Sequence, residues 1–158
     1  MIDGYRIREA TIADTDTIVR HRREMFFDMG HRDTVLLDEL AKSFRPWLTE
    51  KMSKEEYRGW FAIAEDGSIA AGAGVWLMNW PPGLNTSEPW RGNILNVYTE
   101  HEHRRRGLAR TLVTVARDWC GAQGIHIVIL HASDEGRPLY EAMGFQPTNE
   151  MKVFLAGN

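Results

Sequence analysis

The stretch NVYTEHEHRRRGLARTL, residues 96–112, places a cluster of arginines between two segments of regular pattern. Residues 94–99, which lead into the cluster, have the composition of a strand. Residues 105–120, which follow it, repeat apolar side chains at helical spacing, namely Leu108, Leu112, Val115, Ala116 and Trp119. The cluster is therefore predicted to lie where a strand ends and a helix begins.

The start of this helix has the properties of an anion site. The first backbone N–H groups of a helix have no internal partners and lie at the positive end of its dipole. Gly107 and Ala109 lack bulk, so an anion can approach the backbone closely. Positive charge is added to the same turn by Arg104, Arg105, Arg106 and Arg110. These features predict a cradle for a phosphate or pyrophosphate group.

Three other interpretations of the basic cluster stay open at this point. The first is a solvated basic face without a ligand. Nucleic-acid binding is the second, and it is disfavoured because Glu100 and Glu102 interleave with the basic residues. A metal site at His101 and His103 is the third, but no third ligand follows at a recognisable spacing, so no metal is expected.

Composition sets the broad class of the protein. The 158 residues carry a formal net charge of −3, with an isoelectric point near 6.1. This length predicts a single domain over residues 1–158. An acidic chain with one cysteine, Cys120, and no long apolar run indicates a cytoplasmic protein without a nucleic-acid or membrane partner. A homodimer stays open.

Helices and strands are predicted to alternate along the chain, which indicates a mixed α/β sheet. Predicted strands cover residues 5–10, 60–65, 69–78, 94–99, 125–130 and 150–155. Asp66-Gly67 predicts a hairpin between the second and third of them. The nearly apolar run at 125–130 predicts a strand covered on both faces. Together with the helix at 105–120 it forms a right-handed βαβ unit with the strand at 94–99.

Further helices are predicted at four places. One begins at Asp14 and ends near Gly30, a second covers residues 34–44 and is broken or kinked by Pro46, and residues 53–56 offer the capping box of a third. Residues 135–143 form the last. The long loop at residues 79–92, rich in proline and tryptophan, is either a binding loop or a flap over a sheet edge.

Two motifs in order resemble the GNAT superfamily of N-acetyltransferases. The family pattern of Gln or Arg, two residues, Gly, one residue, then Gly or Ala is matched by Arg104, Gly107 and Ala109. The later stretch ASDEGRPLYEAMGF, residues 132–145, is similar to the family's next motif, in which a tyrosine lies shortly before Gly-Phe. Ser133 and Gly136 depart from it, since asparagine and alanine are common at those positions.

The resemblance implies a fold and a cofactor. The fold is a mostly antiparallel twisted sheet of about six to seven strands, with a splayed parallel pair and about four helices. Acetyl-CoA is the implied co-substrate. The implied cofactor-binding residues are Val97, Tyr98, Thr99, Arg104, Arg105, Arg106, Gly107, Leu108, Ala109, Arg110, Ser133, Gly136 and Tyr140. A bulge near Val97 and Thr99 would splay the parallel pair, and a backbone N–H at one of these two positions would polarise the thioester.

The resemblance also implies direct transfer of an acetyl group to a primary amine of a small molecule or a peptide. Tyr140 matches the family's general acid, and Glu100 and Asn96 are the other expected catalytic residues. The general base is not fixed by the motif; candidates are Glu24, Asp28, Asn96, Glu100 and His131. Trp47, Trp76, Trp80 and Trp90 could wall an acceptor pocket. The alternative function is a non-catalytic module that binds an acyl-CoA.

Overall fold

The computed structural model describes residues 2–156. Its strands are β1 (Tyr5–Glu9), β2 (Tyr57–Ala64), β3 (Ile69–Asn79), β4 (Trp90–Thr99) and β5 (Val128–Leu130). Its helices are α1 (Thr15–Asp28), α2 (Thr34–Ser53), α3 (Leu108–Ala122) and α4 (Arg137–Ala142), with short 3₁₀ turns at η1 (Ile12–Asp14) and η2 (His101–His103). No helix among these is long and apolar enough to cross a membrane.

The described strands form one sheet in the order β1-β2-β3-β4-β5. Neighbouring strands are antiparallel except β4 and β5, which are parallel and joined through α3. The mixed α/β class, the βαβ unit and the hairpin at Asp66-Gly67 are therefore confirmed. The number of strands was expected to be higher, and the sheet has five.

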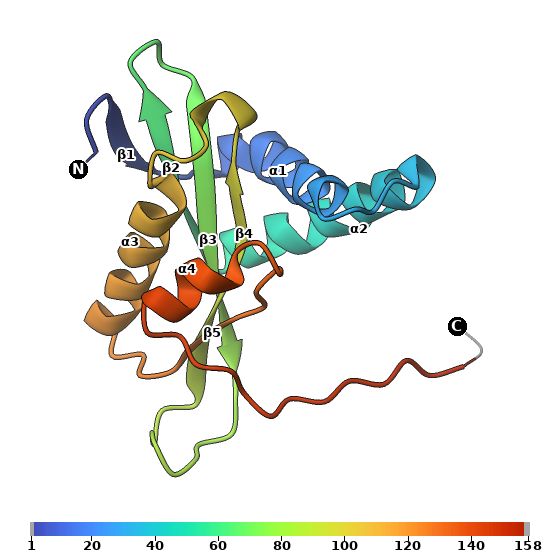
Figure 1. Ribbon diagram of the computed structural model, residues 1–158. Coiled ribbons are helices and arrows are strands. Elements are labelled where there is room, and N and C mark those ends of the chain that lie inside the picture. Colours follow the sequence, from blue (N-terminus) through green and yellow to red (C-terminus); the bar gives the residue numbers. More distant parts are fainter. Residues whose placement is uncertain (1, 157–158) are drawn as a thin grey trace.

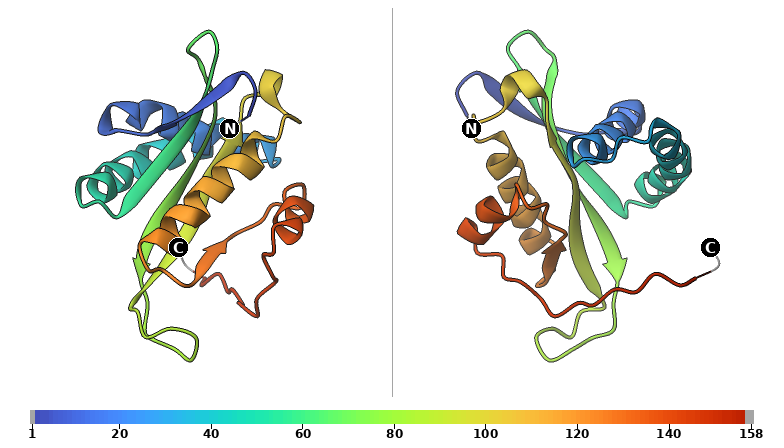
Figure 2. Two further views of the ribbon diagram at one scale, coloured as in Figure 1. Left: turned by 90° about the vertical axis from the view of Figure 1, so that its left-hand side faces the viewer. Right: turned by 45° about the vertical axis from the view of Figure 1, so that its right-hand side comes forward.

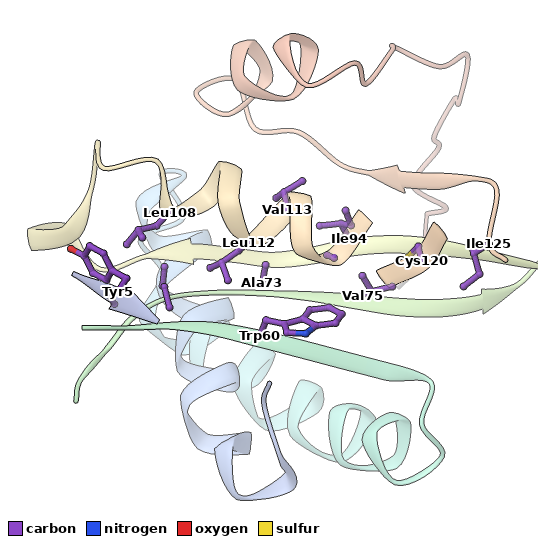
Figure 3. Close-up of a cluster of buried hydrophobic side chains, with 14 residues drawn as sticks. Tyr5, Trp60, Ala73, Val75, Ile94, Leu108, Leu112, Val113, Cys120 and Ile125 are labelled. Atoms are coloured by element: carbon purple, nitrogen blue, oxygen red, sulfur yellow. The ribbon is translucent and has the colours of Figure 1, made fainter. Parts of the chain in front are cut away.

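Helices cover both faces of the sheet (Figures 1 and 2). On one face α3 packs through Leu108, Leu112 and Val113, which lie in a buried cluster with side chains of β2, β3 and β4 (Figure 3). On the other face α1 and α2 bury Ile18 and Leu48 in a second cluster. The sheet is thus fixed from both sides.

Of the two predicted effects of Pro46, a break or a kink in the second helix, the break is wrong. α2 continues through Pro46 to Ser53. Proline removes one backbone donor and clashes with the preceding turn. Here Phe44 and Leu48, on either side of it, are 7% and 0% exposed and anchor both halves of the helix in the same cluster. The capping box at residues 53–56 is also wrong, because β2 begins at Tyr57.

The loop at residues 79–92 is shorter than expected. β3 and β4 remain paired out to Asn79 and Trp90, so the connection covers residues 80–89. Trp80 and Trp90 line a cavity of about 170 Å³ at this end of the sheet.

The last predicted strand, at residues 150–155, is absent from the described structure. After α4 the chain runs on without a strand, and β5 is the final strand of the sheet. All three residues of β5 are only partly buried. The expectation that this strand is covered on both faces is therefore wrong.

Candidate active site

A bulge in β4 opens the sheet next to β5. Gly74 of β3 pairs with Leu95 and Gly72 pairs with Tyr98, so two residues of β4, Asn96 and Val97, lie opposite one residue of β3. Asn96 has a φ of +57°, a left-handed conformation that is uncommon outside glycine. Pairing of β4 with β5 ends at Ile94. The predicted bulge and the splayed parallel pair are confirmed.

The free edge of β4 presents backbone groups to the gap beside β5. The N–H of Glu100 donates to the carbonyl of Ala70 in the β3 direction. Because successive residues of a strand face opposite edges, the N–H and C=O of Thr99 face the free edge. The Thr99 carbonyl accepts a hydrogen bond from Arg104 Nε at 2.9 Å. Val97, two residues earlier, lies on the same edge.

A buried chain of polar groups holds the bulge. Arg22 of α1 donates to Asn96 Oδ1 at 2.8 Å, and Asn96 Nδ2 donates to the Tyr57 hydroxyl at 3.1 Å. Burial raises the pKa of Tyr57 to about 12, so the phenol stays neutral. A Cβ added at Gly74 would lie 2.0 Å from this hydroxyl oxygen. Gly74 is therefore required for the chain of hydrogen bonds.

The basic loop, residues 104–107, turns the chain into α3 with two left-handed residues. Arg105 has a φ of +62° and Gly107, the N-cap of α3, a φ of +78°. A Cβ at Gly107 would meet only Ile2, at 3.8 Å, so the glycine is needed for its conformation rather than for space. Left-handed residues in such a turn direct successive N–H groups into an anion-binding concavity. The first N–H groups of α3 join them.

The arginines of the cluster have different partners. Arg104 donates to Asp28 at 2.6 Å as well as to Thr99, which ties the loop to α1. Arg106 donates to the Tyr5 hydroxyl at 3.2 Å. Arg105 and Arg110 are exposed and form no ion pair with any residue from 2 to 156. These two arginines are therefore available to an incoming anion.

Other residues of the predicted cofactor set contribute differently. The Leu108 side chain is 2% exposed and belongs to the core, so only its backbone can contact a ligand. The Tyr98 ring is also buried, lying 5.0 Å from the His21 ring and beneath the Arg104 guanidinium. Ala109 lies in the first turn of α3. The side chains of these residues thus support the cradle rather than line it.

Tyr140 projects from α4 and packs with its ring against the same core as Val97. Its ring centroid lies 6.0 Å from that of Phe145. A Cβ at Gly136 would approach the Tyr140 ring to 3.1 Å, so glycine lets the ring lie close to the start of α4. Ser133 Oγ accepts the N–H of Gly136 at 3.1 Å. Burial raises the pKa of the Tyr140 phenol, which keeps it protonated at neutral pH.

Glu100 follows β4 directly and lies among basic groups. Arg20 donates to Glu100 Oε1 at 2.5 Å, and His21 Nε2 lies 3.3 Å from the same oxygen. Burial would raise the pKa of Glu100, but the hydrogen bond and charge of Arg20 lower it below its usual value. Glu100 is therefore a carboxylate at neutral pH and a weaker base than an ordinary glutamate.

His21 is a residue that the sequence analysis did not single out. It is 1% exposed, and its ring lies beside Phe61 and Tyr98. Gly72 makes room for it, since a Cβ there would lie 3.0 Å from His21 Nδ1. The sequence did contain a signal for the burial of His21, because it falls three residues after Ile18 on the apolar face of the predicted helix.

Burial of His21 should make the protein less stable in mild acid. Burial first, and the charge of Arg20 second, lower the pKa of His21 to about 4. Between the ordinary pKa near 6.5 and this value the unfolded chain binds a proton that the folded chain does not. The free energy of unfolding should therefore fall as the pH drops through this window, by about 3 kcal/mol at most.

Urea denaturation at a series of pH values between 7 and 4 measures this effect. His21→Gln cannot take up the proton and should show a flatter dependence, whereas His126→Gln, at an exposed position, should keep the wild-type slope. An equal slope in wild type and His21→Gln would contradict the assignment.

The remaining candidates for the general base have partners of their own. The Asp28 carboxylate binds Arg104 and lies 3.5 Å from His101 Nε2. The carboxylate of Glu24 lies 3.5 Å from Arg23, and His131 Nε2 lies 3.5 Å from the Glu150 carboxylate.

His101 and His103, the residues of the possible metal site, lie in the η2 turn instead of a strand. Within residues 2–156 no three metal-ligating side chains gather at one place.

The four tryptophans expected around an acceptor pocket divide into two groups. The rings of Trp47 and Trp76 lie 5.4 Å apart beside the core under α2. Trp80 and Trp90 instead line the cavity at the β3–β4 connection, where Arg91 lies 4.0 Å over the Trp80 ring. The tryptophans therefore do not wall a single pocket.

The parallel pair of the mixed sheet therefore separates beside a bulge, next to a basic loop that starts a helix. The sequence profile of the Acetyltransferase (GNAT) family matches residues 17–145, and the chain belongs to this family. The protein is thus an acetyl-CoA-dependent acyltransferase. No curated protein matches the chain in sequence.

Solved structures show the same fold over nearly the whole chain. A GCN5-related N-acetyltransferase from Ralstonia eutropha is 37% identical, with 98% of this chain and 100% of that chain covered and a TM-score of 0.91. A predicted acetyltransferase from Clostridium acetobutylicum, solved with acetyl-CoA, is 28% identical, with 96% of each chain covered and a TM-score of 0.83. Glucosamine-6-phosphate N-acetyltransferase from Arabidopsis thaliana, 20% identical with a TM-score of 0.66 and 98% and 100% coverage, shares the fold.

Proposed function

We propose that the protein transfers the acetyl group of acetyl-CoA to a primary amine of a small molecule or peptide, by direct attack of the amine. The observation that carries this proposal is the free edge of β4 beyond Ile94, where the bulge leaves backbone donors without a strand partner. A thioester placed along this edge would lie between β4 and β5, with the basic loop at one end.

The residues of the basic loop fit the pyrophosphate of coenzyme A. Two left-handed residues and the start of α3 turn several N–H groups toward one place, and the exposed side chains of Arg105 and Arg110 add charge there. Arg104 and Arg106 act mainly by holding the loop against α1 and β1 through Asp28 and Tyr5. Ser133 and Gly136 shape the turn before α4 on the other side of the gap.

Acetyl-CoA supplies the acetyl group as an activated thioester. One backbone N–H on this edge, that of Val97 or that of Thr99, donates to the thioester oxygen as negative charge develops on it. The new carbon–nitrogen bond forms as the carbon–sulfur bond breaks. Tyr140 gives its proton to the departing sulfur, which a phenol can do because its ordinary pKa is near 10.

The amine must also lose a proton. Glu100 is a carboxylate next to the reacting strand, so we propose that it attracts the ammonium form of the acceptor and receives its proton through water. Asn96 makes both of its side-chain hydrogen bonds inside the protein. We therefore assign Asn96 the role of fixing the bulge, with no direct contact to the acceptor.

A panel of primary amines tests the function. Purified protein with acetyl-CoA should release free thiol only when an accepted amine is present, and mass spectrometry should show that amine heavier by one acetyl group. The panel should contain amino sugars, aminoglycosides, polyamines and peptides with free amino ends or lysines. Reactions without amine and without protein are the controls. Tight binding of acetyl-CoA with no acetylated product from any amine would instead support a non-catalytic acyl-CoA-binding module.

A further inference from the structure

Arg22 of α1 carries a charge that no described residue pairs. Its guanidinium donates a hydrogen bond to Asn96 Oδ1 at 2.8 Å, but it forms no ion pair within the part of the chain that the structure describes. The two other arginines of α1 differ in this respect, since Arg20 and Arg23 each bind a carboxylate. Arg22 is thus the arginine of this helix whose charge is left without a described counter-charge.

The surroundings of this guanidinium make an unpaired charge costly. Its central carbon lies 5.2 Å from the ring centroid of Phe26 and 4.9 Å from that of Phe44, and the side chain is partly buried. The two rings offset part of the cost through cation–π contacts. Burial lowers the pKa of Arg22, but a guanidinium stays protonated at neutral pH. Buried charges usually have a counter-charge, and none of the residues from 2 to 156 supplies it here.

Arg22 is able to bind an anionic ligand. A guanidinium has five N–H donors, so the hydrogen bond to Asn96 leaves most of them for a ligand. The side chain keeps part of its surface in solvent, which gives a ligand access to it. Its planar fork of donors matches the two oxygens of a carboxylate. Beside apolar rings, where water is partly displaced, such a pair is stronger than it would be in bulk water.

The position of Arg22 is beside the reacting strand, on the face away from the proposed coenzyme site. Its partner Asn96 precedes Val97 in the bulge of β4. Val97 and Tyr140 pack with α3 on one face of the sheet, whereas α1 and α2 cover the other (Figure 1). In the proposed reaction the coenzyme lies on the side of Tyr140, so the amine approaches from the face that carries Arg22. A group that Arg22 holds would therefore lie close to the thioester.

We propose that Arg22 binds a carboxylate of the acceptor, and that the acceptor is a free amino acid, whose carboxylate is one carbon away from its amine. This inference rests on the proposed function, because it assigns the acceptor of that reaction. One guanidinium neutralises one charge, which matches a carboxylate better than a phosphate monoester of nearly two charges. Glu100, bonded to α1 through Arg20, supplies the opposite charge for the ammonium group of the same molecule.

A requirement for this carboxylate narrows the class of acceptors. The amine at the start of a peptide has an amide in place of the carboxylate, and polyamines and aminoglycosides have none. These amines would take water away from Arg22 without giving it a partner. A site built around a hydrogen-bonded group discriminates against a ligand that lacks it, so these amines should react more slowly than an amino acid.

Matched acceptors test the proposal. For wild type, kcat/KM should be about 10–100-fold higher for an amino acid than for its amide, the discrimination that a hydrogen bond between charged groups supports. Arg22→Gln can still donate to Asn96 but has no charge, so this ratio should largely disappear. Arg22→Lys keeps the charge and should keep part of the ratio. A general disturbance of the bulge would lower both rates and cancel in the ratio.

The matched control is Arg23→Gln, on the same helix. Arg23 lies 3.0 Å from Asp38, so its charge is already paired, and the variant should keep the wild-type ratio. An amino phosphonate with the same side chain serves as the second comparison for wild type. It should react more slowly than the amino acid, because it brings more charge than Arg22 neutralises.

Calorimetry separates this inference from the reaction itself. Each common amino acid is titrated into the complex of the protein with coenzyme A; at least one should bind, and Arg22→Gln should weaken that binding about 10–100-fold. Acetylation of amines without a preference for the carboxylate would overturn the inference and leave the proposed reaction in place. Binding that Arg22→Gln weakens, without any acetylated product, would support the carboxylate site and contradict the reaction. The inference also fails if no amino acid binds, if the ratio survives Arg22→Gln, or if the phosphonate is preferred.

Discussion

Tyr140→Phe should lower kcat by about 10²–10⁴, the usual contribution of a positioned general acid. This corresponds to roughly 3–5 kcal/mol of transition-state stabilisation. The ring is held by packing, with Phe145 on one side and the glycine-containing start of α4 on the other. Phenylalanine keeps this packing, so the thermal stability and the affinity for acetyl-CoA should hardly change.

Steady-state kinetics with an amine from the panel measures the effect. The loss should occur in kcat and not in the KM for acetyl-CoA, because the proton reaches sulfur only as the bond breaks. Calorimetry with coenzyme A and thermal unfolding of the variant serve as controls for binding and folding. A rate within about threefold of wild type, where the chemical step limits turnover, would show that water or another residue supplies the proton.

Gly107→Glu should abolish most of the affinity for acetyl-CoA. Gly107 has a φ of +78° at the N-cap of α3, where the proposed cradle lies. A carboxylate about 4 Å from a phosphate charge costs on the order of 4 kcal/mol at an effective dielectric constant of 20. We therefore expect the dissociation constant to rise at least about 100-fold.

The control must separate charge from backbone strain. Gly67, in the β2–β3 hairpin, has a φ of +87° and open space around it, much like Gly107. Gly67→Glu should therefore lose similar stability, about 1–2 kcal/mol, but bind coenzyme A as wild type does. Gly107→Asn should bind well, because asparagine tolerates this conformation. Calorimetry with coenzyme A compares all three; unchanged affinity of Gly107→Glu would mean that the pyrophosphate lies elsewhere.

Sequence alone could predict those elements of the fold whose signals are local. The apolar spacing of α3 and the dipeptide Asp66-Gly67 each specify an element within a few residues. The bulge in β4 was predicted from the resemblance to a family and not from propensity, since Asn96 in a left-handed conformation leaves no local signature.

Other parts depend on contacts between distant residues. Pro46 predicts a break or a kink, but the helix continues through it, with Phe44 and Leu48 buried on either side. Residues 150–155 have the pattern of a strand, yet they pair with no strand of the described structure. In both cases the outcome depends on contacts with distant residues, which a local pattern does not encode.

The candidate site was predicted unevenly for the same reason. The motif residues around Gly107 and Tyr140 could be located by their order in the sequence. The chain that links Arg22, Asn96 and Tyr57 could not, because its members come from α1, β4 and β2 and meet only in the folded protein. The arginine partners of Glu100 and Asp28 could not be predicted either, because they are distant in the sequence.

The hydrogen bonds that link Arg22, Asn96 and Tyr57 join the first half of the chain to the second. They therefore limit how freely the two halves of such an enzyme can be recombined. The bulge in β4 opens toward the proposed coenzyme site, but Arg22 and Tyr57 hold it from the face that carries α1 and α2. Redesigning those helices to accept a new amine would disturb the bulge unless both Arg22 and Tyr57 are retained. A chimera that joins the first half of one relative to the second half of another would keep the bulge only if its first half supplies the equivalents of Arg22 and Tyr57.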